Sequence, residues 1–79
     1  MTLYWVSMII CDDDGNKPWL CSFTDGITNL SVAKDKIKIM RDQHNVISAW
    51  IDVFDKNNNK TTIFHECYID VMGNIKKER

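Results

Sequence analysis

The sequence predicts a single α+β domain of ββαββ order, in which two β-hairpins form a four-stranded sheet and one helix packs on one face. Three observations support this. Four apolar runs suited to strands lie near residues 3–11, 18–24, 46–54 and 61–71. A polar loop separates the two runs of each pair, and one segment with helical periodicity lies between the pairs. Because 79 residues hold one core, we expect one domain over residues 1–72 and a flexible polar tail over 73–79.

The first run, YWVSMII, is apolar on both sides. Alternate side chains of a strand point to opposite faces, so the run has two sets of outward-pointing residues. One set is Tyr4, Val6, Met8 and Ile10, and the other is Trp5, Ser7 and Ile9. A strand that is covered on both faces suits the middle of a sheet, so we expect this strand to be central.

Two similar loops, Asp12–Lys17 and Asp55–Lys60, are predicted to be hairpin tips. Gly15 and Asn58 occupy the same place in the two loops, and both residue types tolerate the left-handed conformation that such a tip requires. If each loop is of the three-residue type, odd-numbered residues lie opposite odd-numbered residues across each hairpin.

The segment between the hairpins is predicted to be the helix. Apolar residues recur at helical spacing at Leu30, Ala33, Ile37 and Met40. Asn45 follows as a terminator, and the N-cap is Thr28, Asn29 or Ser31. A helical crossover makes the second and third strands parallel if they share one sheet.

A helix of about fifteen residues covers one side of a four-stranded sheet and cannot reach the other. With the register above, we assign the helix to the face with Trp5, Ile9, Trp19, Cys21, Phe23, Ala49 and Ile51. The face left uncovered then carries Tyr4, Val6, Met8, Ile10, Trp50, Phe54, Phe64 and Tyr68, with Leu20 and the acidic residues Asp52, Glu66 and Asp70. A register shift of one residue exchanges the two faces, but the first hairpin is apolar on both.

An exposed apolar patch on a small domain usually marks a binding surface. We therefore predict a non-enzymatic interaction module. It either forms a homo-oligomer, most simply a dimer, or docks a protein partner. Its predicted interface consists of Tyr4, Val6, Met8, Ile10, Trp50, Phe54, Phe64 and Tyr68. No catalytic residue, metal site or cofactor is predicted, and the net charge of −1 creates no general attraction to nucleic acid or membranes.

An alternative hypothesis is a nucleic-acid-binding accessory protein. Lys34, Lys38 and Arg41 align on one face of the predicted helix, where they could contact phosphates. The simpler interpretation is a solvated helix surface, because Lys38 and Asp42 stand at i, i+4.

A third hypothesis is a small metal or thiol protein. Cys11, Cys21, His65 and Cys67 are soft ligands, although their spacing is unlike that of zinc sites in small domains. Three cysteines without framework spacing favour reduced thiols, and hence a cytoplasmic location. The sequence contains no segment that we interpret as a targeting signal or a membrane span.

Overall fold

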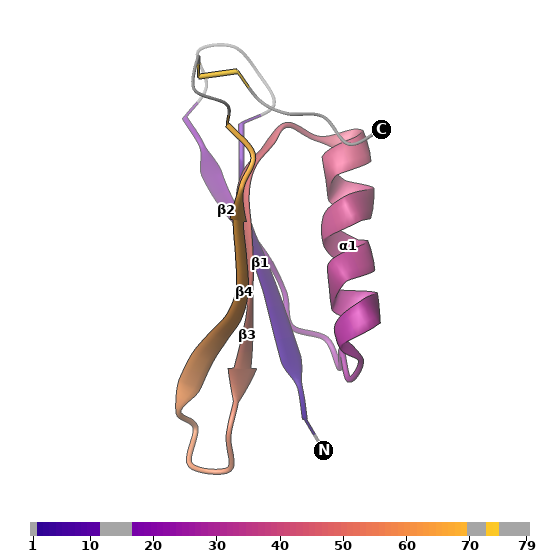
Figure 1. Ribbon diagram of the computed structural model, residues 1–79, viewed down its shortest axis with the longest axis vertical. Coiled ribbons are helices and arrows are strands. Elements are labelled where there is room, and N and C mark those ends of the chain that lie inside the picture. The colour runs from indigo at the N-terminus through magenta and orange to yellow at the C-terminus, as the bar shows by residue number, and fades with distance from the viewer. Residues whose placement is uncertain (1, 12–16, 70–72, 75–79) are drawn as a thin grey trace.

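The computed structural model describes residues 2–11, 17–69 and 73–74 and confirms the α+β fold with ββαββ order. The elements are β1 (Tyr4–Ile10), β2 (Trp19–Phe23), α1 (Leu30–Gln43), β3 (Val46–Phe54) and β4 (Lys60–Cys67). The strands form one antiparallel sheet in the order β2-β1-β3-β4, and α1 lies along one face of it (Figure 1). Most of the predicted tail and the loop tip with Gly15 fall outside the described residues.

The YWVSMII strand, β1, is central as predicted. It pairs antiparallel with both β2 and β3, so β2 and β3 run in the same direction with β1 between them. Two further backbone hydrogen bonds extend the pairing at its ends. The Tyr4 N–H donates to the Ile27 carbonyl at 2.8 Å, and the Cys11 N–H donates to the Asn45 carbonyl at 2.9 Å.

Asn29, one of the three predicted candidates, is the N-cap of helix α1. Asn29 has extended backbone angles, and its side-chain oxygen accepts the Ser31 N–H at 2.8 Å, which satisfies one of the N–H groups that a helix start leaves unpaired. At the other end His44 is extended, and its N–H donates to the Met40 carbonyl at 2.8 Å. The helix therefore ends at Gln43, and His44, rather than the predicted Asn45, is its C-cap.

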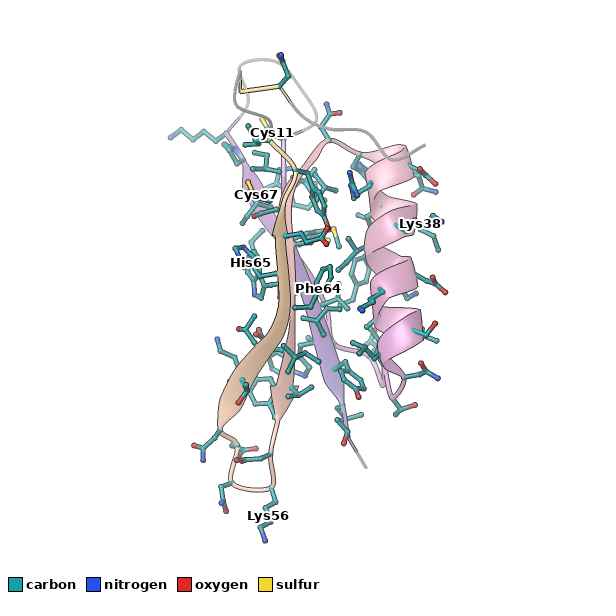
Figure 2. The ribbon with its side chains drawn as sticks, viewed as in Figure 1. Cys11, Lys38, Lys56, Phe64, His65 and Cys67 are labelled. Atoms are coloured by element: carbon teal, nitrogen blue, oxygen red, sulfur yellow. The ribbon has the colours of Figure 1, made fainter. Side chains whose placement is uncertain are left out.

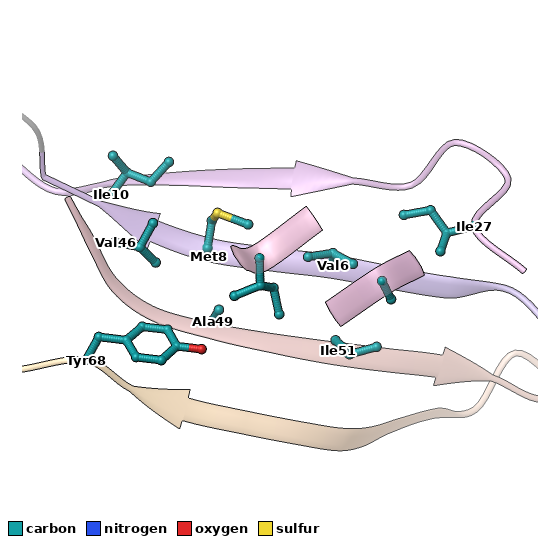
Figure 3. Close-up of a cluster of buried hydrophobic side chains, with 10 residues drawn as sticks. Val6, Met8, Ile10, Ile27, Val46, Ala49, Ile51 and Tyr68 are labelled. Carbon is teal, nitrogen blue, oxygen red and sulfur yellow. The ribbon is translucent and has the colours of Figure 1, made fainter. Parts of the chain in front are cut away.

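The hydrophobic core lies between α1 and the sheet (Figure 3). Val6, Met8 and Ile10 of β1 are completely buried there. The other core residues are Ile27, Ala33, Ile37, Val46, Ala49, Ile51 and Tyr68. Burying a side chain of this size contributes about 1.5–3 kcal/mol, so this layer supplies most of the hydrophobic stabilisation.

The predicted register of the first hairpin is wrong by one residue. Val6 lies opposite Phe23 and Met8 opposite Cys21, so even-numbered residues face odd-numbered ones. This pairing excludes the odd-to-odd register that the predicted three-residue loop would give. The even-numbered side of β1 is consequently the side that α1 covers.

The second hairpin has the predicted register near its tip only. Asn58 has a φ of 63°, as the predicted turn requires, and Asp52 lies opposite Thr62. The register then shifts between Ile51 and Asp52, because Ile51 pairs with Phe64 and leaves Ile63 as an extra residue. This β-bulge turns Phe64 and the residues after it to the opposite face from the one predicted.

Asp55 organises the tip of this hairpin. Its Oδ1 accepts the N–H groups of Asn57 and Asn59 at 2.8 and 2.9 Å. These hydrogen bonds stabilise the carboxylate and hold the pKa of Asp55 below its ordinary value. The tip extends well beyond the end of α1 (Figure 1), so the helix covers neither face of the hairpin there.

Candidate functional site

The sheet face turned away from α1, here called the open face, has no cover among the described residues. Figure 2 shows His65 and Cys67 on this side of β4, whereas Phe64 points toward the helix. The strand pairing places on the open face Trp5, Ser7, Ile9, Leu20, Ser22, Ser48, Trp50, Asp52, Phe54, Lys60, Thr62, His65 and Cys67. Aromatic and aliphatic side chains therefore alternate with small hydroxyl-bearing ones across this surface.

Four ring side chains form two pairs on the open face. The rings of Trp5 and Phe54 have centroids 4.4 Å apart and planes at 50°. The rings of Trp50 and His65 meet edge to face, with centroids 6.2 Å apart. Trp5 remains 39% exposed although it belongs to the central strand. These pairs present rigid apolar area at little cost in side-chain freedom.

The polar groups on the open face are largely bonded to one another. The Thr62 hydroxyl donates to the Asp52 carboxylate, and the hydroxyls of Ser7 and Ser22 lie 3.2 Å apart across β1 and β2. Asp52 is only 3% exposed, since Trp5 stands directly opposite it in the ladder. The carboxylate therefore presents little charge to anything that covers this face.

Two shallow hollows lie on the open face, one of them next to the tip of the β3–β4 hairpin. The larger has a volume of about 440 Å³ and is lined by Leu3, Trp5, Phe54, Asp55 and Asn58. The smaller, of about 280 Å³, is lined by Trp50, Thr62 and His65. Both hollows lie beside an aromatic pair, where a side chain of a partner could insert.

The predicted interface residues divide between the two faces. Trp50 and Phe54 lie on the open face, as predicted. The placement of the other six residues there is wrong, because Tyr4, Val6, Met8, Ile10, Phe64 and Tyr68 lie on the helix side. The one-residue register error in the first hairpin and the bulge at Ile63 account for these corrections.

Sequence reasoning missed Trp5 and Ile9 as members of the uncovered surface. The available signal was the distribution of serines. Ser7, Ser22 and Ser48 all lie on the open face, and small hydroxyl residues are expected where one side of a strand is not packed into a core.

The three predicted cations lie together beside the edge of the sheet. Lys34, Lys38 and Arg41 line a hollow between α1 and β4 with Ile37, Phe64, Glu66 and Tyr68. The Lys34 ammonium lies 5.4 Å from the Phe64 ring centroid, and the Arg41 guanidinium lies 3.7 Å from that of Tyr68. Cation–π contact thus holds two of the three cations over aromatic rings.

The cysteines and histidine of the third hypothesis do not converge. His65 and Cys67 share the open face of β4, whereas Cys21 lies opposite Met8 on the helix side. Within the described part of the chain, no three His, Cys, Asp or Glu residues are placed to hold one metal ion. In the same part of the chain, no helix has the length and apolar character needed to cross a membrane.

Comparison with protein-family models, with curated proteins and with solved structures finds no match to this chain.

Proposed function

We propose that this protein is a non-enzymatic interaction module that self-associates through its open face. The observation that carries the proposal is that one helix covers one side of the sheet and leaves Trp5, Trp50 and Phe54 on the other. Apolar aromatic surface of this kind is typical of protein interfaces. The three cysteines fit a reduced, cytoplasmic setting for this role.

The size of the open face fits a weak association with a second copy. Four strands spaced about 4.8 Å apart, each with about seven residues of 3.3 Å rise, present roughly 450 Å². Two copies packed face to face would then bury about 900 Å² in total, which is in the range of weak or transient interfaces. Sheets packed in this way lie about 10 Å apart, with their side chains interdigitated.

The charge distribution on the open face also favours a second copy over a charged partner. A two-fold interface places the same patch on both sides, so an exposed charge near the axis would face the same charge of the second copy. The one carboxylate in the ladder of this face, among the described residues, is Asp52, which is nearly buried and bonded to Thr62. Lys60 is at the hairpin tip, away from the centre of the face.

Light scattering across a range of protein concentrations tests this proposal, with Trp50→Lys as the disrupting variant. We expect the parent to have at least twice the mass of one chain, and Trp50→Lys to lower the mass at least twofold. The matched control is Ile39→Lys, since Ile39 is an exposed apolar residue on the outer surface of α1. A parent that is monomeric at every concentration, or a Trp50→Lys variant of unchanged mass, would refute self-association through this face.

A second candidate function is nucleic-acid binding along α1. It is favoured by one observation, that Lys34, Lys38 and Arg41 line a single hollow. Ammonium and guanidinium groups gathered in one hollow are suited to phosphate binding. The presence of Glu66 in the same hollow weakens this candidate relative to the first.

Gel-shift titrations with single- and double-stranded oligonucleotides at several salt concentrations test the second candidate. If it is correct, Lys38→Gln weakens binding and lowers the salt dependence by about one phosphate contact. Lys36→Gln is the control, because Lys36 lies over the Phe23 ring on the other side of the helix. Equal effects of the two variants, or no binding by the parent, would exclude the hollow as a nucleic-acid site.

A further inference from the structure

The two edge strands of the sheet differ in how their outer backbone is protected. An edge strand presents N–H and C=O groups that can pair with another chain, and proteins guard such edges with charged residues and β-bulges. Edge strand β4 has both devices. It carries Lys60 and Glu66, and the bulge at Ile63 interrupts its ladder.

Edge strand β2 has neither device. Its sequence, WLCSF, contains no charged residue, and its five residues pair with β1 without a register shift. Trp19 is 47% exposed, and Leu20, at 60%, is the most exposed large apolar side chain in the described part of the chain. A regular, uncharged edge with exposed apolar side chains is suited to strand addition.

We propose that β2 of a second copy adds antiparallel to this edge, so that the two sheets join into one eight-stranded sheet. An antiparallel strand pair built from identical five-residue strands in full overlap must centre on the middle residue, which is Cys21. Trp19 then lies opposite Phe23 of the second copy, and Leu20 lies opposite Ser22. These pairs match aromatic with aromatic and bring no like charges together.

The occupant is a second copy because the edge is complementary to itself. A charged peptide would find no ion-pair partner on β2, whereas a second β2 supplies both the backbone groups and the matching rings. The two-fold axis is perpendicular to the sheet, so both helices lie on one side and both open faces on the other. This edge contact is therefore separate from the open-face association and does not depend on it.

Disulfide trapping at Cys21 tests the arrangement directly. Residues directly opposite in an antiparallel pair have Cβ atoms about 4.5–5.5 Å apart, close to disulfide reach. In a variant with Cys11→Ser and Cys67→Ser, copper(II)-phenanthroline is expected to give a disulfide-linked dimer on a non-reducing gel. The comparison variant carries Ile39→Cys with all three cysteines changed to serine, because Ile39 is exposed on the outer surface of α1 and belongs to neither proposed contact. We expect its crosslinking to be at least fivefold slower.

Two further substitutions separate the edge from the open face. Trp19 lies on the helix side of the sheet, opposite Ile10, so Trp19→Lys charges the edge without touching the open face. Trp19→Lys, or Trp19→Glu if the first variant does not fold, should abolish Cys21 crosslinking, while Trp50→Lys should leave it unchanged. Crosslinking at Cys21 no faster than in the Ile39→Cys variant, or unaffected by a charge at Trp19, would overturn the proposal. If Trp50→Lys alone abolishes crosslinking at Cys21, the contact lies on the open face instead.

Discussion

The two faces of β1 have nearly the same hydrophobicity and very different surroundings. On one face Val6 and Met8 are completely buried beneath α1, and on the other Trp5 is 39% exposed. The difference arises because the one helix of the described chain packs on only one side of the sheet. The fully buried apolar residues of β1 therefore lie on the helix side, whereas Trp5 on the other side stays partly exposed.

The largest expected effect contrasts Met8→Ala with Ile9→Ala, two neighbours on opposite faces. Met8→Ala removes a fully buried side chain and leaves a cavity, so it should lower the free energy of unfolding by about 2–5 kcal/mol. Ile9→Ala should cost less than Met8→Ala at low protein concentration, because Ile9 is only partly buried on the open face. Urea titration followed by circular dichroism measures both values.

Thermal midpoints measured at several protein concentrations extend the comparison between the two faces. If the open face binds a second copy, the thermal midpoint of the parent rises with concentration, because association stabilises the folded chain. Ile9→Ala should reduce that rise, whereas Met8→Ala should lower the midpoint equally at all concentrations. Equal losses from the two substitutions at low concentration would mean that the two faces are buried alike, contrary to the structure.

An intermediate effect is expected at the start of the helix that creates the difference between the faces. Asn29→Ala removes the oxygen that accepts the Ser31 N–H, and the loss of an N-cap costs about 0.5–2 kcal/mol. Asn29→Asp keeps an acceptor and adds a negative charge at the helix N-terminus, so it should match or exceed the parent in stability. Destabilisation by Asn29→Asp as large as that by Asn29→Ala would rule out this capping role.

Much of the fold could be predicted from local patterns. The central position of YWVSMII, the helix around Ala33 and Ile37, and the left-handed Asn58 each follow from a few adjacent residues. The face assignment could not be predicted in the same way. It depends on the register between β1 and β2 and on the extra residue Ile63, and each of these differs from the prediction by one position.

The strand register also limits how much of the candidate sites could be predicted. The alignment of Lys34, Lys38 and Arg41 follows from helical spacing alone, and the structure brings all three to one hollow. That Phe64 and Tyr68 would lie beneath two of these cations could not be foreseen, because the bulge decides which face these rings occupy. Trp50 lies on the uncovered face as predicted, because alternation within β3 alone puts it on the opposite side from Ala49 and Ile51.

The smallest expected effect is at the hairpin tip, which α1 covers on neither side. The pKa of Asp55 is lowered by hydrogen bonds from the N–H groups of Asn59 and Asn57, so the folded state favours the charged form. A depressed pKa gives stability that is present above the unfolded pKa and is lost as pH falls through the folded one. Asp55→Asn keeps an acceptor oxygen without the charge. The parent should therefore unfold at a slightly higher urea concentration than Asp55→Asn at neutral pH, and the gap should close below about pH 3.8, the ordinary Asp value. A gap that does not change with pH would show that the amide oxygen alone accounts for the turn, and that the charge of Asp55 does not contribute to it.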